Sequence, residues 1–441
     1  MQRNLSGING PFPLIQAALD FLELDRAVSL AKDAVNGNVD WIEVGTPLIK
    51  SEGMEAIRVL RKLFPKHVIV ADLKTMDAGR VEFESACRAG ADAAVVLAAA
   101  SDSTIIQCVE AGKKFGIKVY CDTIGIADPV KRAVEVEALG VDYIGVHCAV
   151  DDQMRGNDPL DSLRVVASAV KIPVAVAGGI TAKTASRMVQ AGASIIVIGG
   201  ALHKAVNPAE EALAIRNAVF SDHVGEKKCL SDLSSQKDNT IRSILLGVST
   251  SNLSDAMHHE PAMRGIICRT PTLKMVGKAV TVRTIPGDWS KVVQAIDSAE
   301  KGSILVVDAG GNAPAVWGEM ATQTAKLKGL SGIVVDGAIR DTDIALSLNF
   351  PMFSRLVCSD AGDPKGFGEI GVRILCGERV VEHGDWILGD ADGVMVLPSH
   401  KAVEYANRAR DVTESENRLR QEILSGKSLS ELANLSRWEV R

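Results

Sequence analysis

The chain has 441 residues, more than one hydrophobic core usually serves, so we expect at least two domains. Hydrophobic residues make up 46% and charged residues 24%, which is typical of a soluble globular protein. The net charge of −6 argues against a general nucleic-acid binder, because such proteins neutralise phosphates with basic patches. The sequence lacks an apolar run of membrane-spanning length and a secretory leader, and its eight cysteines are scattered without a C-x-x-C pair. We therefore expect a cytoplasmic protein that binds small molecules, not nucleic acid or membrane.

The first half of the chain, from residue 13 to about residue 202, repeats one plan in which short apolar runs alternate with amphipathic helical patterns. Apolar runs of this kind are typical of parallel strands that helices cover. The eight runs are L-I-Q-A-A-L-D, W-I-E-V-G, V-I-V-A-D-L-K, A-A-V-V-L-A, K-V-Y-C-D-T, Y-I-G-V-H-C, P-V-A-V-A-G-G and I-I-V-I-G-G. Eight units in roughly 200 residues predict a TIM (β/α)8 barrel, with a doubly wound open sheet as the alternative.

The segment that follows is polar and has no sustained apolar periodicity, so we interpret residues 217–239 as a linker between a barrel domain, 1–216, and a second domain, 240–441. In the second domain short strands mix with fewer helices and many glycine turns. This pattern of elements predicts a smaller α/β or β/β/α domain. The chain closes with a charged helical segment, E-S-E-N-R-L-R-Q-E-I-L.

The ends of the predicted barrel strands carry the candidate functional residues, because the loops that follow the strands gather at the catalytic face of such barrels. In chain order these are Asp20, Glu43, Asp72 with Lys74, Asp122, His147, Gly178 with Gly179, and Gly199 with Gly200. Glycine pairs after the last two strands allow backbone N–H groups to approach a phosphate. Acids can hold Mg²⁺, a lysine can stabilise an oxyanion or move a proton, and a histidine can transfer protons near neutral pH.

Each of these residues also has an ordinary structural explanation. Asp72 could cap a helix, Lys74 could form a surface ion pair, and His147 could be a hydrogen-bonded core histidine. Their common position at the strand ends of one inferred face favours an active site instead.

The stretch D-L-K-T-M-D, residues 72–77, resembles the D-x-K-x-x-D motif of the orotidine-monophosphate decarboxylase superfamily. Together with A-L-D, I-E-V-G-T-P, Y-I-G-V-H and V-A-V-A-G-G-I, residues 12–215 resemble the 3-hexulose-6-phosphate synthases. This resemblance implies an aldehyde-lyase that adds formaldehyde to D-ribulose 5-phosphate to give hexulose 6-phosphate, and that also runs the reverse reaction. It further implies a divalent cation, Mg²⁺ or Mn²⁺, that stabilises an enediolate.

The same resemblance implies roles for individual residues. Glu43 and Asp72 are expected to bind the metal, Lys74 to lie beside the enediolate oxygens, and His147 to transfer the proton. Asp77 is expected to reach the site of a neighbouring subunit, which implies a dimer of barrels.

Other positions bear on the substrate. Asp20 resembles a contact to a substrate hydroxyl, and Gly178, Gly179, Gly199 and Gly200 match the phosphate loops. Ala201 stands where the 3-keto-gulonate-phosphate decarboxylases have an arginine, which favours a synthase and leaves the decarboxylase as the alternative.

Residues 310–343 are the densest stretch of the second half. The turn Gly310–Gly311 precedes a helix expected to begin near Trp317, and a strand expected to end at Asp336 precedes R-D at 340–341. Arginine suits bidentate recognition of a carboxylate, and an acid suits a hard metal ion. A surface R-D pair in a turn is the ordinary alternative.

The region 240–425 resembles the RraA-like family, which includes 4-hydroxy-4-methyl-2-oxoglutarate aldolase and a regulator of ribonuclease activity. In this family an acid is followed by twenty residues and then R-D, and here Glu319 to Arg340 leaves 340 − 319 − 1 = 20 residues. The resemblance implies that Asp341 binds Mg²⁺, Glu319 holds it through water, and Arg340 grips the carboxylate of a 2-oxo acid, with Gly310 and Gly311 in the substrate turn. An aldolase or oxaloacetate decarboxylase is expected, while a non-catalytic regulator or an oligomerisation module is the alternative. RraA-like trimers and barrel dimers together imply a higher homo-oligomer.

Overall fold

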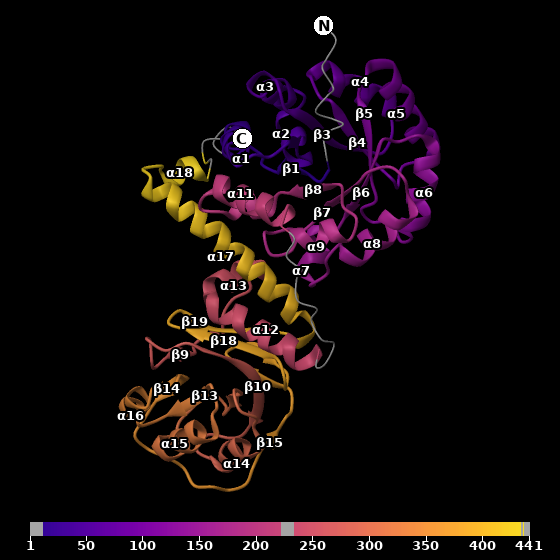
Figure 1. Cartoon of the computed structure of the whole chain (residues 1–441). Coiled ribbons are helices and arrows are strands. Elements are labelled where there is room, and N and C mark those ends of the chain that lie inside the picture. Colours follow the sequence, from indigo (N-terminus) through magenta and orange to yellow (C-terminus); the bar gives the residue numbers. More distant parts are fainter. Residues whose placement is uncertain (1–11, 222–232, 434, 436–441) are drawn as a thin grey trace. The chain divides into compact units, whose positions relative to one another are not determined.

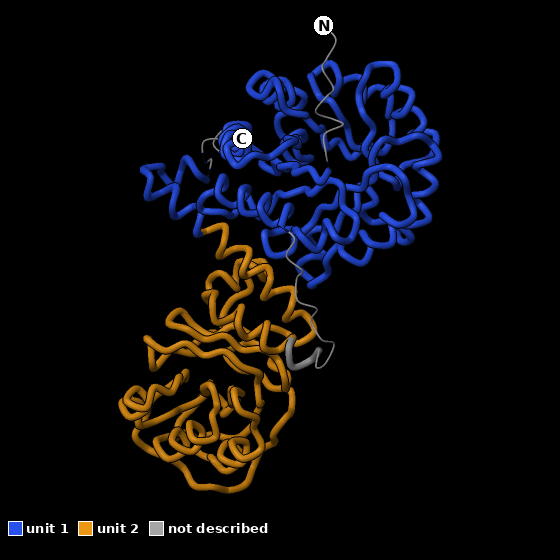
Figure 2. Tube along the Cα trace, in the orientation of Figure 1, with its two compact units in different colours: residues 1–228, 417–441 blue, residues 229–416 orange. Residues whose placement is uncertain are grey.

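The computed structural model describes residues 12–221, 233–433 and 435. The chain divides into two compact units, one of residues 1–228 with 417–441 and the other of residues 229–416 (Figure 2). This division differs from the expected one at the C-terminal end, because residues 417–433 belong to the first unit. Among the described residues, no helix combines the length and apolarity that a membrane crossing requires.

The first unit is a closed barrel of eight parallel strands in sequential order, as predicted (Figure 1). The strands are β1 (Leu14–Leu19), β2 (Trp41–Val44), β3 (Val68–Thr75), β4 (Ala93–Leu97), β5 (Lys118–Asp122), β6 (Tyr143–His147), β7 (Val174–Ala177) and β8 (Ile195–Ile198). The helices are α1 (Leu24–Asn36), α2 (Thr46–Glu52), α3 (Glu55–Leu63), α4 (Gly79–Ala89), α5 (Asp102–Phe115), α6 (Pro129–Leu139), α7 (Val150–Met154), α8 (Leu160–Ala169), α9 (Ala185–Gln190), α10 (Gly200–Lys204) and α11 (Pro208–Val219). Each of the eight apolar runs identified in the sequence is one of the strands.

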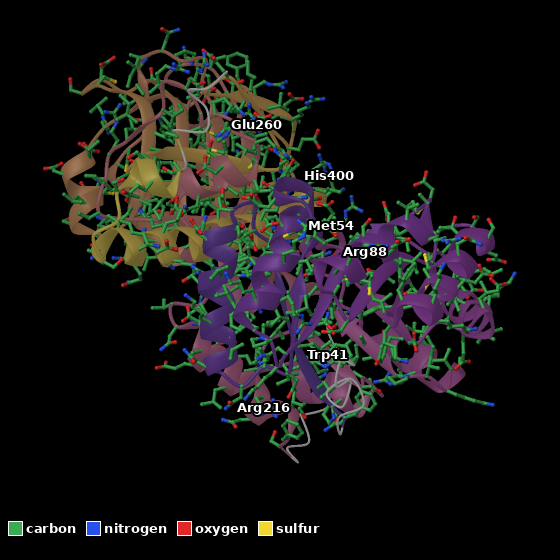
Figure 3. The ribbon with its side chains drawn as sticks, turned by 90° about the horizontal axis from the view of Figure 1, so that it is seen from above. Trp41, Met54, Arg88, Arg216, Glu260 and His400 are labelled. Carbon is green, nitrogen blue, oxygen red and sulfur yellow. The ribbon has the colours of Figure 1, made fainter. Side chains whose placement is uncertain are left out.

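Alternation along the strands divides the barrel's apolar residues between two cores. In β1, Ile15 and Leu19 belong to the core between strands and helices, whereas Leu14 and Ala18 belong to the core inside the barrel. Trp41 lies in this inner core with its ring edge-on to Tyr143, at 5.5 Å between centroids (Figure 3). Because side chains fill the interior, the barrel is a packed scaffold and only its mouth is open to substrates.

The second unit is built on a mixed nine-stranded sheet. Its main path runs β19-β18-β10-β11-β13-β14-β9, while β12 pairs with β13 and β15 with β10. The strands are β9 (Ile267–Cys268), β10 (Met275–Arg283), β11 (Ile304–Asp308), β12 (Ala315–Trp317), β13 (Gly332–Ile339), β14 (Met352–Val357), β15 (Glu369–Ile370), β18 (Trp386–Asp390) and β19 (Gly393–Leu397), with a separate hairpin of β16 (Ile374–Cys376) and β17 (Arg379–Val381). Neighbours among β10, β11, β13 and β14 are parallel, and β18, β19 and β9 are antiparallel additions.

Helices complete this α/β unit. They are α12 (Leu233–Gly247), α13 (Thr250–Ala256), α14 (Ser290–Ser298), α15 (Glu319–Lys328), α16 (Thr342–Ser347) and α17 (Ala402–Leu424). Ala402, Ala406 and Ala409 of α17 are fully buried in one core with residues of α12, α13, β18 and β19. The residues of α17 from 417 onward, and α18 (Leu429–Leu432), belong to the first unit.

The helix expected near Trp317 begins two residues later, at Glu319, because residues 315–317 form the short strand β12. One local expectation for the second half was wrong. The strand expected to end at Asp336 continues to Ile339, so Asp336 lies inside β13, where Arg355 pairs with its carboxylate. Part of the expected linker, residues 222–232, lies outside the described residues.

Candidate active site

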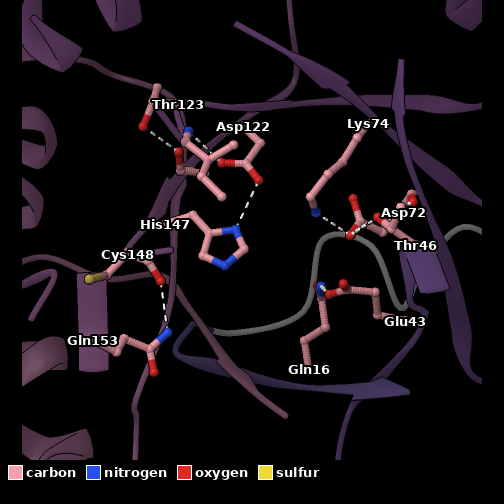
Figure 4. Close-up of polar contacts among 12 residues, drawn as sticks. Gln16, Glu43, Thr46, Asp72, Lys74, Asp122, Thr123, His147, Cys148 and Gln153 are labelled. Carbon is pink, nitrogen blue, oxygen red and sulfur yellow. Dashed lines mark hydrogen bonds and ion pairs between the residues drawn. The ribbon is translucent and has the colours of Figure 1, made fainter. Parts of the chain in front are cut away.

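Polar side chains from five barrel strands converge at the mouth of the barrel (Figure 4). They are Gln16 of β1, Glu43 of β2, Asp72 and Lys74 of β3, Asp122 of β5 and His147 of β6. Glu43, Asp72 and Asp122 are buried, with at most 9% of each exposed. Buried carboxylates are costly unless partners or ligands compensate them, so this concentration needs a chemical reason.

Strand β3 is irregular where it delivers its two charged residues. Between Ala71 and Thr75 its register against β4 shifts, and Lys74 has a φ of 48°, in the left-handed region that side chains other than glycine rarely adopt. The Lys74 Nζ atom lies 2.5 Å from Asp72 Oδ2. The two residues therefore meet through a bulge, and not through the regular two-residue period of a strand. Backbone strain of this kind is concentrated at functional sites.

Asp72 has one engaged and one unengaged carboxylate oxygen. Thr46, the first residue of α2, donates its hydroxyl to Asp72 Oδ2 at 2.7 Å and to the Asp72 carbonyl at 2.8 Å. The other oxygen, Oδ1, is buried and has no hydrogen-bond partner among the described residues. A buried carboxylate oxygen without a partner is the kind of atom that a cation or a substrate hydroxyl would satisfy.

Glu43 is the most strongly perturbed acid at the barrel mouth. Burial, followed by the charges of Asp72 and Asp20, raises its pKa well above the usual range, although a hydrogen bond from Gln16 and the charge of Lys74 oppose this. Burial first, and then Asp72, likewise raise the pKa of Asp20. Carboxylates that repel one another in this way gain stability when a divalent cation enters.

The oxygen atoms at the barrel mouth suit an ion such as Mg²⁺ that takes only some of its ligands from the protein. Among the described residues, no group of three or more His, Cys, Asp or Glu side chains forms a cage for a metal. Mg²⁺ is commonly bound through one or two carboxylates and keeps water or substrate oxygens in its other positions. Glu43 and the unpartnered oxygen of Asp72 match this pattern.

Lys74 remains a cation across the neutral pH range. Burial acts to lower the pKa of its ammonium group, but the charge and hydrogen bond of Asp72, with the charges of Asp122 and Glu43, raise the pKa overall. A lysine held in this state can stabilise an oxyanion but is a poor proton acceptor. Of the two roles that the sequence left open for Lys74, the geometry favours charge stabilisation.

His147 is oriented by a buried acid. Its Nδ1 atom lies 3.0 Å from Asp122 Oδ2, and the other oxygen of Asp122 accepts a hydrogen bond from the Ile124 backbone N–H at 2.9 Å. An acid fixed in this way favours a proton on Nδ1 and leaves Nε2 to exchange protons. Figure 4 shows the His147 ring joined to Asp122 by this contact.

The glycine pairs line the same mouth, after β7 and β8. Gly178 has a φ of 111°, and a Cβ atom there would lie 2.6 Å from the Cys148 carbonyl oxygen, so a side chain does not fit. Asp20 follows β1, and a Cβ on Gly199 would lie 3.3 Å from Asp20 Oδ2. The structure thus brings Asp20 beside the turn that contains Gly199 and Gly200.

Asp77 is the one predicted barrel residue that lies apart from the cluster. It is exposed in the turn between β3 and α4. Its expected role in the site of a second subunit remains a prediction.

Sequence reasoning missed three residues of the site. Gln16 supports Glu43, Thr46 supports Asp72, and Gln153 donates its amide to the Cys148 carbonyl at 2.8 Å beside Gly178. A glutamine inside the apolar run L-I-Q-A-A-L was a signal for the first. Thr46 carries no such signal, since its contact with Asp72 joins two elements 26 positions apart in the sequence, and Gln153 reaches Cys148 through the local turn after β6.

In the second unit, Asp341 contacts the Arg340 side chain and the backbone of Glu319, while the Glu319 carboxylate accepts a hydrogen bond from Gln323 at 2.9 Å. Asp341 Oδ2 accepts the Glu319 backbone N–H at 3.0 Å and lies 3.5 Å from Arg340 Nε. Asp341 has a φ of 57° directly after β13, and Gly318 leaves room for its carboxylate, which a Cβ there would approach to 2.8 Å. Arg340 is half-exposed, so its guanidinium is accessible to a carboxylate ligand.

The turn Gly310–Gly311 lies in a different setting. Both glycines have a φ of 71°, and a Cβ on Gly311 would lie 3.6 to 3.7 Å from Arg355 and Asp336. The Arg355 Nε atom is 2.5 Å from Asp336 Oδ1, and the Gly377 N–H donates to Asp336 Oδ2 at 2.7 Å. The glycine turn therefore lies beside a largely buried ion pair, which the sequence did not reveal.

Comparison with known proteins matches each half of the chain separately. Residues 13–215 match the orotidine 5′-phosphate decarboxylase / HUMPS family, and residues 250–396 match the RraA-like family, described as Aldolase/RraA. The 3-hexulose-6-phosphate synthase of Mycobacterium gastri is 40% identical over 205 residues, which are 46% of this chain and 99% of that protein. The synthases of Methylomonas aminofaciens and Bacillus subtilis are 42% and 37% identical over 203 and 206 residues, again 46% of this chain and 97% and 98% of those proteins.

These relatives match the barrel along almost their whole length. Through its barrel the chain belongs to the orotidine 5′-phosphate decarboxylase / HUMPS family, as an aldol-type lyase related to 3-hexulose-6-phosphate synthase, and it carries an RraA-like domain fused behind the barrel.

Proposed function

We propose that the barrel catalyses the divalent-metal-dependent aldol addition of formaldehyde to D-ribulose 5-phosphate, giving hexulose 6-phosphate, and the reverse reaction. The observation that carries this proposal is the unpartnered buried oxygen of Asp72, within reach of a lysine and beside a second buried acid, Glu43. The names of the synthases that match the barrel support the substrate class.

In this reaction the chain's own residues orient the substrate, stabilise charge and move one proton. Glu43 and Asp72 would hold Mg²⁺ or Mn²⁺, which when bound supplies positive charge that favours an enediolate. His147 takes the proton from C1 of ribulose 5-phosphate on Nε2, while Asp122 stabilises the imidazolium through Nδ1. Lys74 donates hydrogen bonds to the negative oxygen that develops.

The carbon–carbon bond then forms between C1 of the sugar and the carbon of formaldehyde. The electron pair of the formaldehyde C=O bond moves to its oxygen, and that oxygen receives the proton that His147 removed, so that atoms and charges balance. In the reverse direction, His147 accepts the hydroxyl proton as formaldehyde leaves. We assign the phosphate to the backbone N–H groups of the turns at Gly178–Gly179 and Gly199–Gly200, and a substrate hydroxyl to Asp20.

Replacing Asp72 tests the barrel proposal. We expect Asp72→Ala to lower formaldehyde-dependent consumption of ribulose 5-phosphate by on the order of 100-fold or more, because it removes a ligand at the charge-stabilising centre. Product-resolved chromatography with and without formaldehyde and Mg²⁺ measures this. Asp161→Asn, which changes an exposed acid on α8, is the control and should retain activity.

Full activity in Asp72→Ala would refute the proposed metal role. The alternative is a decarboxylase of the same superfamily. It would be supported if the wild-type protein does not consume ribulose 5-phosphate with formaldehyde but releases CO₂ from 3-keto-gulonate 6-phosphate.

We propose a second lyase site in the RraA-like domain, at Arg340, Asp341 and Glu319. What favours it is the juxtaposition of an accessible guanidinium with a carboxylate at the end of β13. Asp341 would hold Mg²⁺ directly and Glu319 through water, and Arg340 would bind the carboxylate of a 2-oxo acid. The alternative is a domain that only regulates or oligomerises.

The remaining proposals concern organisation. We propose that a linker joins the barrel domain to the RraA-like domain, in a cytoplasmic homo-oligomer. In that assembly Asp77 would complete the site of a neighbouring barrel.

A further inference from the structure

A side chain from the far end of the sequence contacts the barrel behind its expected phosphate turn. Arg418 lies in the last part of α17, within residues 417–441, which pack with the barrel in one compact unit (Figure 2). The family match of the barrel ends at residue 215, and about 200 residues of this chain account for nearly the whole length of the synthase relatives. The barrel therefore receives a contact from outside the region that it shares with them.

Arg418 caps the helix that follows the second glycine pair. Its guanidinium donates through one Nη atom to the Leu202 carbonyl at 3.4 Å and to the His203 carbonyl. Both carbonyls belong to α10, which begins at Gly200. Carbonyl groups at a helix end lack partners within the helix, and a cation there is favourable. The position of α10 thus depends on a residue more than 200 positions away in the sequence.

Arg418 also reaches the segment that carries Asp20. Its guanidinium carbon lies 5.9 Å from the centroid of the Phe21 ring, and Phe21 stacks on His203 at 4.5 Å. His203 donates from Nε2 to the Ala18 carbonyl of β1 at 2.9 Å. Phe21, His203 and Arg418 therefore form one packed cluster that joins the end of β1 to α10.

The Arg418 side chain is itself held in place. Its Nε atom lies 3.3 Å from Glu422 Oε1, and Glu422 also pairs with Lys427 at 2.9 Å and faces Arg26 of α1 at 3.8 Å. The Arg418 and Glu422 side chains are only 15% and 16% exposed, so solvent screens this pair less than an open surface pair. A side chain ordered in this way can hold its partners in a fixed place.

We infer that Arg418 is a positioning residue for the barrel's site: by holding α10 and Phe21, it sets the turn at Gly199–Gly200 and the adjacent Asp20 in the geometry that receives the substrate's phosphate end. This inference rests on the proposed sugar-phosphate function, because it presumes that a phosphate binds at this turn. The residue touches neither substrate nor reacting atoms, so its effect is on binding geometry and not on the chemical step.

The test replaces Arg418 in the full-length chain. We expect Arg418→Ala to raise the KM for ribulose 5-phosphate about fivefold to tenfold with kcat changed less than about twofold, since small displacements of a binding group weaken binding before chemistry. Glu422→Gln should shift KM in the same direction by a smaller factor, and Arg418→Lys should restore part of the loss. Arg420→Ala is the matched control, because Arg420 is exposed on the same helix and donates to Asn417.

Binding of inorganic phosphate, measured by calorimetric titration, gives a readout that does not depend on turnover. Weaker phosphate binding in Arg418→Ala, with unchanged binding in Arg420→Ala, would support the inference even if the protein does not react with formaldehyde. A purely structural role would lower kcat through loss of active protein and leave KM and phosphate affinity unchanged, which would overturn the inference. If Arg418→Ala does not fold, an unchanged KM and phosphate affinity in Glu422→Gln would overturn it as well.

Discussion

At the scale of single residues, the barrel mouth contains several features that are energetically unfavourable in a folded protein. Lys74 has a left-handed backbone, Asp72 leaves a buried oxygen without a partner, and Glu43 has a raised pKa. A cation bound as proposed would satisfy the Asp72 oxygen and offset the charge repulsion at Glu43, whereas the backbone strain at Lys74 would remain.

His203 should make the stability of the barrel depend on pH. Burial first, and then the charges of Arg418, Lys204 and Arg26, lower its pKa to about 4, although the hydrogen bond to Ala18 opposes this. In the unfolded chain a histidine titrates near its ordinary pKa of about 6.5. Between these two pKa values the unfolded state binds a proton at His203 and the folded state does not. The free energy of unfolding is therefore unaffected by His203 above pH 6.5 and decreases as the pH falls towards 4.

We expect this loss to amount to about 2 to 3 kcal/mol of the free energy of unfolding. Urea denaturation at pH 7 and at pH 4.5 measures it as the difference between wild type and His203→Gln, in which the amide does not titrate. His383→Gln, which changes an exposed histidine, should behave as wild type. Equal pH dependence in wild type and His203→Gln would show that burial of His203 has no such effect.

At the scale of elements, irregular segments of backbone bring the functional groups to the barrel mouth. The bulge in β3 turns Lys74 onto Asp72, and the turns after β7 and β8 bring main-chain groups to the barrel mouth. The regular parts of the strands form a rigid frame that holds the bulge and the turns in fixed positions. Function is therefore located where the local pattern of the strand breaks.

The turn after β7 should be intolerant of even one methyl group. At Gly178 an alanine combines a φ of 111° with a contact of 2.6 Å to the Cys148 carbonyl, so we expect Gly178→Ala to lower the free energy of unfolding by roughly 2 to 4 kcal/mol and to raise KM for the sugar phosphate. Gly116→Ala is the matched control, because φ is 77° there and nothing lies within 4 Å of the added carbon. Its cost should be about 1 kcal/mol with no change in KM.

Urea denaturation and steady-state kinetics on both variants separate the two contributions. If both alanine variants lose the same stability and keep the same KM, the close approach at Gly178 has no consequence beyond backbone strain.

At the scale of the whole molecule, two architectures with separate hydrophobic cores share one chain. Within the part of the chain that the structure describes, each hydrophobic core is made of residues from one unit alone. α17 is the element that contributes to both compact units, through its buried alanines in one and Arg418 in the other. Separate cores favour separate chemistry, each with its own ligands.

We therefore expect the two proposed activities to be lost independently. Arg340→Ala should reduce Mg²⁺-dependent release of pyruvate from oxaloacetate on the order of 100-fold, because it removes the bidentate partner of the substrate carboxylate, and should leave consumption of ribulose 5-phosphate unchanged. Asp72→Ala should have the opposite pattern. A coupled pyruvate assay on both variants measures this, with Arg373→Ala, an exposed arginine of the same domain, as control.

Absence of pyruvate release in the wild type, or its persistence in Arg340→Ala, would contradict catalysis at this site and favour a regulatory or oligomerising domain.

Much of this protein follows from its sequence. The eight apolar runs and the glycine pairs indicated the barrel and its mouth, because strand burial, turn geometry and strand-end position depend on residues close together in the chain. The expected chemistry came from the resemblance of the motif D-L-K-T-M-D to a known family. The spacing from Glu319 to R-D similarly placed the residues that meet in the second unit.

What only the tertiary structure decided are the contacts between residues far apart in sequence. The support of Glu43 by Gln16 spans 27 positions, and that of His203 by Arg418 spans 215. The strand period suggested that Asp72 and Lys74 share a side, but their meeting depends on a bulge that local propensity does not encode. Such contacts arise because closing the barrel brings strand ends together and packing then selects their partners, information that no short stretch of residues contains.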